Sequence, residues 1–235
     1  MIYIKQYRNE WKYICKESDL ARLNERISGV LELDCNSGVD GRYEIHSVYF
    51  DDFKNTCMMD NNAGINERYK YRIRYYGRNV DILRLERKEK LNNKCHKQSC
   101  KILPDTFTKL LNNEAQEVYW ETDNAVLKKF CVDMMTRQFT PKVIIHYERT
   151  AYVEPAANIR ITLDRNIMAS GEIESFLQGD YIRHPVQEKN EHILEVKFDY
   201  ILPAYIKNIV TDSSLVQTAF SKYYLGRQTL LGRGQ

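Results

Sequence analysis

Basic and apolar residues alternate along the segment from Arg68 to Arg74, which reads Arg-Tyr-Lys-Tyr-Arg-Ile-Arg. Because successive side chains of a β-strand point to opposite faces, this alternation predicts a strand with four cations on one face. The other face is aromatic or aliphatic and is the one that can be buried. Neighbouring cations then stand about 7 Å apart along the strand, and such a row is costly unless an anion lies against it.

Seven further segments have a period of two or are rich in aromatic and β-branched residues, which predicts about eight strands. The glycine at position 77, between the third and fourth of them, indicates a hairpin and therefore antiparallel pairing. The seven segments are Lys5 to Tyr13, Arg42 to Asp51, Ile82 to Lys90, Lys97 to Lys101, Lys142 to Arg149, Ile159 to Arg165 and His192 to Asp199.

Helical periodicity appears between the predicted strands. A polar stretch from Asp60 to Asn66 predicts a mobile loop. The predicted helices are one capped by Ser18 that carries Leu20, Leu23 and Ile27, one capped by Asp105 that carries Phe107 to Leu111, one that follows Asp123 and runs through Met134, and two between Pro203 and Leu225 with a break near Asp212.

Eight strands with one charged face each can close in two ways. A sandwich would bury the apolar faces and leave the charged faces outside on both sheets. A barrel with its charged faces inward surrounds a charged, hydrated passage, and its apolar exterior is covered by helices. The number of predicted helices favours this second fold: an α+β, eight-stranded antiparallel tunnel barrel with a charged interior and helices packed outside.

Charge is concentrated in one region of the 235-residue chain, which we expect to form a single domain over residues 1–235. The formal net charge is only +3, yet residues 68–101 contain 12 lysines and arginines against three acids. This asymmetry favours a defined polyanion site over general adhesion to nucleic acid or membrane.

The six cysteines form no C-x-x-C pair, and the first residues contain no apolar signal-peptide core, so we expect a cytoplasmic location. Cys95, His96 and Cys100 do not have the spacing of a zinc site. The five histidines, among them His46 and His146, also show no site-like spacing. No apolar run is long enough to span a bilayer, so a link to a membrane requires a partner protein.

A series of short motifs, in order along nearly the whole chain, resembles the VTC domain. This is the polyphosphate polymerase domain of the vacuolar transporter chaperone complex, within the CYTH or triphosphate tunnel metalloenzyme superfamily. The motifs are Glu10-Trp11-Lys12, SVYFDD from Ser47, KYRIRYYG from Lys70, LERK from Leu85, YERTAY from Tyr147, IRITLD from Ile159, LEVK from Leu194 and FSKYYLG from Phe220.

The resemblance implies a tunnel enzyme that transfers the terminal phosphate of ATP onto a polyphosphate chain with Mn²⁺ or Mg²⁺. It implies that Ser221 and Lys222 hold phosphate at one mouth of the tunnel and that Glu195 binds the metal. The other implied phosphate ligands are Lys12, Arg72, Arg74, Lys88, Lys101, Arg149 and Arg160.

Two positions depart from the family pattern. Asn61 or Asn62 stands where the family has a further arginine, for which Arg68 and Lys70 are possible substitutes, and Ala219 replaces a lysine near the SKY motif. We expect fewer cations at the mouth and an intact central cluster. Lys197, in phase with Glu195, is a further possible phosphate ligand.

The chemistry of phosphate binding agrees with these residue types. Arginine binds phosphate oxygens bidentately, lysine adds a movable charge, and phosphoryl transfer requires mainly positioning and charge stabilisation. Carboxylates are the expected ligands of a hard metal ion. Glu195 is the best candidate for this role. Glu86 and Glu10 either bind metal or neutralise tunnel cations, and the sequence supports these two roles equally.

Three functions remain open from the sequence. The first is an ATP-dependent polyphosphate polymerase, and the second is a triphosphatase that uses water as the acceptor for tripolyphosphate or an organic triphosphate. The third is a non-catalytic polyphosphate or nucleotide sensor, which is suggested by the departures from the family pattern at Asn61 and Ala219. In all three the partner is ATP, polyphosphate or another triphosphate, and no sequence-specific nucleic acid is expected.

Overall fold

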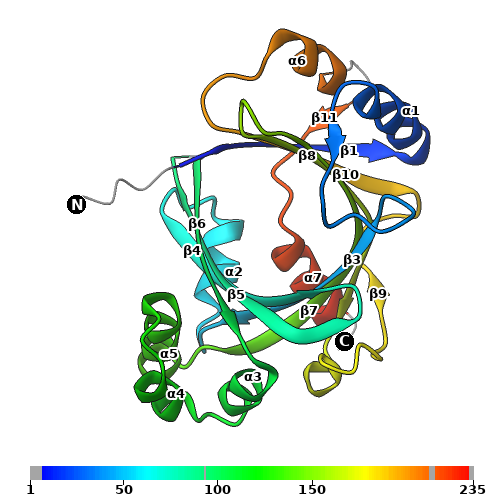
Figure 1. The fold of residues 1–235 in the computed structure, drawn as a ribbon. Coiled ribbons are helices and arrows are strands. Elements are labelled where there is room, and N and C mark those ends of the chain that lie inside the picture. The colour runs from blue at the N-terminus through cyan, green and yellow to red at the C-terminus, as the bar shows by residue number, and fades with distance from the viewer. Residues whose placement is uncertain (1–6, 93, 212–214, 233–235) are drawn as a thin grey trace.

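The computed structural model describes residues 7–92, 94–211 and 215–232. Its centre is one antiparallel sheet that curves around a central space (Figure 1). Eight strands are long: β1 (Asn9–Lys16), β3 (Tyr43–Asp51), β4 (Arg68–Tyr76), β5 (Asn79–Leu91), β6 (Lys94–Ile102), β7 (Thr140–Glu154), β8 (Ile159–Ser170) and β10 (Glu191–Phe198). They follow the order β1-β10-β8-β7-β3-β4-β5-β6. Three two-residue strands complete the sheet: β2 (Glu32–Leu33), β9 (His184–Pro185) and β11 (Val216–Gln217).

The sheet is nearly a closed barrel. Arg8, just before β1, and Cys95 of β6 exchange two backbone hydrogen bonds with N···O distances of 2.9 and 3.0 Å. This isolated bridge joins the segment before β1 to β6, the long strand at the other end of the order, and within the described residues it is not part of a ladder. The predicted eight-stranded antiparallel tunnel is therefore confirmed in its long strands, whereas the sheet as a whole has eleven strands in the described residues and is not fully closed.

The hairpin between β4 and β5 follows the sequence prediction. Tyr76 pairs with Asn79 across a two-residue turn, and Gly77 adopts a φ of +58° there. A left-handed φ at the first turn position suits a residue without a Cβ.

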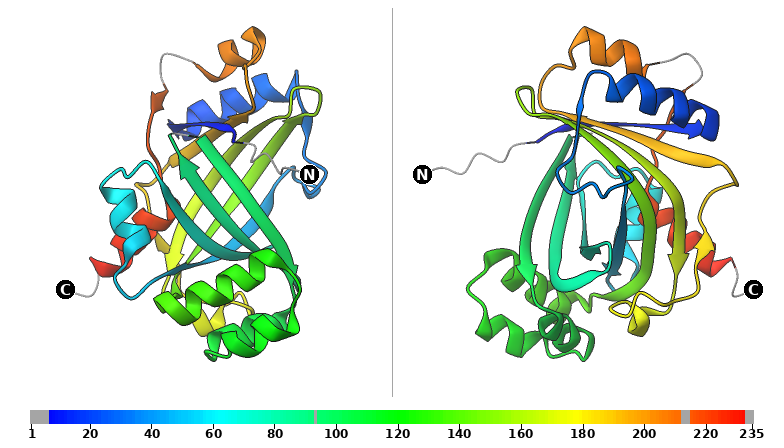
Figure 2. Two further views of the ribbon diagram at one scale, coloured as in Figure 1. Left: turned by 90° about the vertical axis from the view of Figure 1, so that its left-hand side faces the viewer. Right: turned by 45° about the vertical axis from the view of Figure 1, so that its right-hand side comes forward.

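Helices cover the outer, apolar face of the sheet at two places (Figure 2). On one side, Tyr71 of β4 contacts Phe130 with ring centroids 4.7 Å apart. On the other side, Leu20, Leu23 and Ile206 pack with the outward residues of β1, β8 and β10. The first group is α3 (Pro104–Leu111), α4 (Ala115–Glu121) and α5 (Ala125–Arg137), and the second is α1 (Glu17–Ser28) and α6 (Ala204–Val210).

The last helix, α7 (Lys222–Leu231), lies against the concave side of the sheet and so differs from the expected outer helices. Its Tyr223 stacks on Tyr49 of β3 with centroids 5.5 Å apart and donates a 2.5 Å hydrogen bond to Asp51. A Cβ on Gly226 would lie 2.3 Å from the side chain of Ile145, so glycine permits this close approach. One end of the tunnel is therefore closed by α7.

A further helix, α2 (Thr56–Asn62), covers part of the segment where a loop was expected. The carboxylates of Asp51 and Asp52 accept hydrogen bonds from the backbone N–H groups of Thr56, Cys57 and Met58 at 2.8–3.0 Å. These contacts satisfy the free N–H groups of the first helical turn. They come from residues before the helix, so the local apolar pattern alone did not reveal it.

Three predicted helix starts are off by one or two residues. α1 begins directly after Lys16, because the backbone N–H of Lys16 donates to Asp19 at 3.0 Å, so Ser18 is not the cap. The N-cap of α5 is Asn124, and α3 starts with Pro104 in place of an Asp105 cap. The helix break expected near Asp212 lies outside the described residues, but Val216–Gln217 form β11 and α7 begins only at Lys222, so the second predicted helix starts later than expected. In the part of the chain that the structure describes, no helix is long and apolar enough to cross a bilayer.

Candidate functional site

The concave side of the sheet surrounds a cavity of about 660 Å³ to which all eight long strands contribute side chains. Its lining contains twelve lysines and arginines but only three glutamates. Strand alternation places ten of these cations there, whereas Arg8 precedes β1 and Lys222 is the first residue of α7. The cations are Arg8, Lys12, Lys70, Arg72, Arg74, Arg84, Lys88, Lys97, Arg149, Arg160, Lys197 and Lys222.

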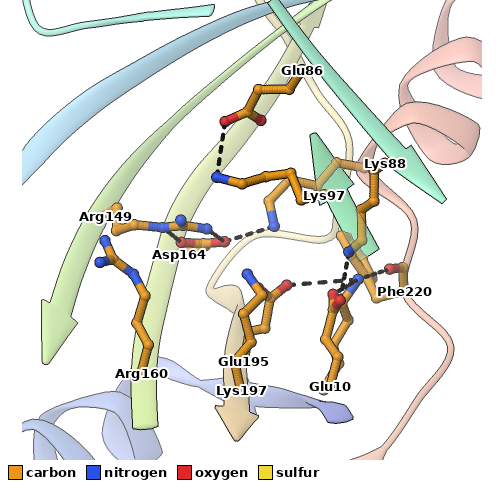
Figure 3. Close-up of polar contacts among 12 residues, drawn as sticks. Glu10, Glu86, Lys88, Lys97, Arg149, Arg160, Asp164, Glu195, Lys197 and Phe220 are labelled. Atoms are coloured by element: carbon orange, nitrogen blue, oxygen red, sulfur yellow. Dashed lines mark hydrogen bonds and ion pairs between the residues drawn. The ribbon is translucent and has the colours of Figure 1, made fainter. Parts of the chain in front are cut away.

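Arg72 and Arg74 of β4 meet Glu86 of β5 inside the cavity. The nearest nitrogen of Arg72 lies 2.7 Å, and that of Arg74 3.2 Å, from one Glu86 oxygen, and Lys97 lies 3.4 Å from the other (Figure 3 shows the Lys97 contact). Burial raises the pKa of Glu86, but the positive charges of Arg72 and Lys97 lower it by more, so that the pKa is about 2. Glu86 therefore neutralises this cluster, which is one of the two roles expected for it.

Arg74 retains a capacity to bind an anion. Its side chain is 5% exposed, and its buried Nε makes no hydrogen bond within the described residues. A buried donor without an acceptor is rare in proteins and is costly. A phosphate oxygen in the cavity is a suitable acceptor.

A second cluster joins the barrel wall to α7. Asp164 of β8 is fully buried and accepts two hydrogen bonds from Arg149 of β7 at 2.6 and 2.8 Å. The Nζ of Lys222 lies 2.6 Å from the same carboxylate. Burial alone would raise the pKa of Asp164, but the two cations hold it below its usual value. Figure 3 shows Arg149 and Asp164 in contact with each other on neighbouring strands.

A third cluster contains the carboxylates that suit a metal ion. Lys12 lies between Glu10 and Glu195, with N···O distances of 3.1 and 3.7 Å, and Lys88 lies 2.5 Å from Glu10 (Figure 3). Burial and the nearby Glu10 raise the pKa of Glu195, whereas Lys197 and Lys12 lower it to about 2. Two ionised carboxylates that share one ammonium group offer the oxygen ligands that Mg²⁺ and Mn²⁺ prefer. The residues present therefore fit the expected metal.

A second cavity of about 420 Å³ continues the first one. The two share Glu10, Lys12, Lys70, Lys88, Cys95 and Ser221, so they form one passage. Lys70 occupies the junction, where its Nζ lies 3.4 Å from the Oγ of Ser221, the N-cap of α7. Lys12 Nζ donates a 2.7 Å hydrogen bond to the carbonyl of Phe220 beside it.

The structure gathers most of the sequence-predicted residues around this passage. The two departures from the family pattern, Asn61 or Asn62 and Ala219, line the second cavity together with Arg68. Lys101 is exposed and does not line either cavity, although it shares the strand phase of Lys97. The lining residues are Lys12, Arg72, Arg74, Lys88, Arg149, Arg160, Ser221 and Lys222, with Arg68, Lys70, Lys197, Glu10, Glu86 and Glu195.

Asp164 and the tyrosines at positions 49 and 147 escaped the sequence reasoning. Asp164 has the same strand phase as Arg160, so alternation did indicate its inward position. Tyr49 accepts a 2.9 Å hydrogen bond from Arg72. Burial raises the pKa of Tyr49, but Arg72 and Lys70 lower it below its usual value. Tyrosines occur widely in this sequence, so nothing in their spacing distinguished these two from core residues.

Lys70 gives the site a pH dependence. Burial, together with Lys88 and Lys12, lowers its pKa to about 8, although Tyr49 acts in the opposite direction. Lys70 is therefore charged below about pH 8, and an anionic ligand stabilises that charged form. We expect tripolyphosphate affinity to fall as the pH rises above about 8, by up to about tenfold per pH unit.

Isothermal titration calorimetry from pH 6.5 to 9.5 measures this effect. The Lys70→Arg variant is the matched control, because arginine remains charged throughout and the ligand titrates identically in both series. The two affinity curves should separate above about pH 8. Parallel curves would show that Lys70 does not titrate in this range.

Comparisons with solved structures agree with the tunnel fold. The adenylyl cyclase candidate HpAC1 from Hippeastrum, for which a dominant triphosphatase activity is described, is 13% identical with a TM-score of 0.57 and covers 95% of each chain. An adenylate cyclase candidate from Bacillus halodurans is 11% identical with a TM-score of 0.50 and covers 83% of this chain and 82% of the other. At such identities the likeness concerns the fold alone.

Sequence comparisons are more specific. No curated protein sequence matches this chain. The VTC domain matches residues 7–231, which include every strand and helix described above. This match extends over far more than half of the sequence. The chain therefore belongs to the VTC domain family.

Proposed function

We propose that this protein is a metal-dependent polyphosphate polymerase that transfers the terminal phosphate of ATP onto a growing polyphosphate chain. The observation that carries the proposal is the continuous passage lined by cations from seven strands. A linear polyanion has the matching charge and can extend through both cavities, whereas a compact anion needs only one cluster. Membership of the VTC domain family supports the same substrate.

The residues of the passage suit phosphoryl transfer without a protein nucleophile. Arg72 and Arg74 bind and orient phosphate oxygens, while Arg149 and Lys222, held by Asp164, fix a further cationic position. A terminal oxygen of the acceptor chain forms the new bond to the γ-phosphorus of ATP, and the bond to the β-phosphate oxygen breaks, releasing ADP. Glu195 and Glu10 would hold a Mn²⁺ or Mg²⁺ ion, which would neutralise phosphate charge.

A triphosphatase is the second candidate. The Hippeastrum protein of similar fold has a dominant triphosphatase activity, and the same cations would bind tripolyphosphate or an organic triphosphate. Water would then replace the acceptor chain.

The cysteines of the described residues are free thiols, in keeping with the proposed cytoplasmic location. A membrane partner protein would be needed to move the product across a bilayer.

Incubation of the full chain with ATP and Mn²⁺ distinguishes the two candidates. The polymerase should produce long anionic chains that form a ladder on a urea–polyacrylamide gel, together with one ADP per phosphate incorporated. Release of free phosphate without a ladder would overturn the polymerase and select the triphosphatase. Tight binding of polyphosphate without turnover of either kind would contradict both enzymes.

A further inference from the structure

A group of three metal-ligating side chains lies on the outer face of the barrel, away from the tunnel lining. His46 of β3 and His146 of β7 are directly opposite each other in the antiparallel register. Both are buried, whereas Glu44, two residues before His46 and on the same face of β3, is 46% exposed. The register, and not any sequence spacing, brings the histidines together, so the sequence showed no such site.

The ligand atoms of these three residues converge. Their donor atoms all lie within 4.8 Å of one another. The Oε2 atom of Glu44 lies 3.4 Å from Nε2 of His46 and 3.8 Å from Nε2 of His146. An ion bound at about 2.0–2.2 Å from each atom requires a contraction of this group, to which the exposed Glu44 can contribute.

The surroundings orient His46 for metal binding. Its Nδ1 lies 2.6 Å from the hydroxyl of Tyr181, and its ring stacks on Tyr75 with centroids 4.4 Å apart. When Nδ1 carries the proton and donates to Tyr181, Nε2 presents its lone pair toward Glu44. Hydrogen bonding of the second ring nitrogen is the usual way in which proteins fix a histidine ligand.

We propose that Glu44, His46 and His146 form a binding site for a borderline transition-metal ion such as Zn²⁺, separate from the metal that acts in the tunnel. Two imidazole nitrogens and one carboxylate are a known zinc ligand set, whereas Mg²⁺ and Mn²⁺ prefer oxygen ligands only. Glu44 lies at the surface, so the fourth coordination position is open to water. This assignment does not depend on the function proposed for the tunnel.

Arg183 is the neighbour that opposes metal binding. Its Nη1 lies 3.4 Å from Nε2 of His146, and the side chain belongs to an exposed residue that also donates to the carbonyl of Gly179. A guanidinium at this position repels a divalent cation and has to move when the ion binds. Removing the charge of Arg183 should therefore strengthen metal binding, which a merely structural histidine pair does not predict.

Titration of the full chain with CoCl₂ tests the site, because Co²⁺ bound to histidine nitrogen gives visible absorption bands. The Glu195→Gln variant is used as the background, so that the tunnel carboxylate pair is weakened. One equivalent of Co²⁺ should bind with visible absorption and be displaced by ZnCl₂. Equilibrium dialysis then measures the affinity for Zn²⁺.

Three substitutions in this background decide the assignment. His146→Gln should abolish the absorption, and Glu44→Gln, at an exposed position that folding tolerates, should weaken Zn²⁺ binding at least tenfold. Arg183→Gln should strengthen it several-fold. Absence of stoichiometric binding, or binding that is unchanged by Glu44→Gln and Arg183→Gln, would overturn the proposal.

Discussion

Replacing Arg74 by glutamine should lower kcat/KM for ATP by about 10²- to 10³-fold while the protein remains folded, since this is the usual cost of removing one charge-stabilising donor. Arg74 is buried and faces the cavity with an unused Nε donor. Its partner Glu86 keeps Arg72 at 2.7 Å and Lys97 at 3.4 Å, so no buried carboxylate is left unpaired. The large loss therefore concerns phosphate binding and not folding.

Steady-state kinetics and a thermal melt of the same preparation measure this result. The control is Arg22→Gln on the surface of α1, which removes one arginine charge far from the tunnel and should leave kcat/KM within twofold. Equal activity of the Arg74→Gln variant and the parent protein would show that the β4 cations do not contact substrate. A collapsed melting transition would instead mean that Arg74 is needed for folding.

Replacing Asp164 by asparagine should destabilise the protein by about 3–5 kcal/mol, because Arg149 and Lys222 then remain buried without a counter-charge. For a chain of this length the melting temperature should fall by about 10 °C. Tripolyphosphate should restore part of this loss, since phosphate oxygens can occupy the place of the missing carboxylate charge.

Differential scanning calorimetry with and without tripolyphosphate measures both effects. Asp81→Asn, at an exposed position near the β4–β5 turn, is the control and should change the melting temperature by less than about 2 °C. An Asp164→Asn variant as stable as the parent would show that the buried cluster is not needed for the fold. A variant that is destabilised but insensitive to tripolyphosphate would separate this cluster from the ligand site.

The strands and their inward faces could be predicted because a period of two is a local signal. Arg72 and Arg74 alternate with Tyr71 and Ile73, and the structure places the first pair in the tunnel and the second in the core. The inner position of α7 could not be predicted in the same way. It depends on the close contact of Gly226 with Ile145, about 80 residues away in sequence.

Prediction of the site from the sequence is limited in the same way, because contacts between distant segments are not a local signal. Single-strand alternation predicts the inward face of the cations on the strands, but their partners across strands depend on register. The clamp of Asp164 on Arg149 and Lys222 joins two strands and a helix, and the pairing of His46 with His146 joins two strands. Lys101 has the correct phase yet lies beyond the cavity, because phase fixes the face of a residue and not its position along the tunnel.

A crystal structure of the full chain with tripolyphosphate and Mn²⁺ tests the central claim most directly. The tunnel account predicts the three phosphates in the cavity, with oxygens within hydrogen-bond distance of Arg72, Arg74 and Arg149. Tripolyphosphate bound only on the outer surface of the sheet, with a water-filled passage inside, would contradict it.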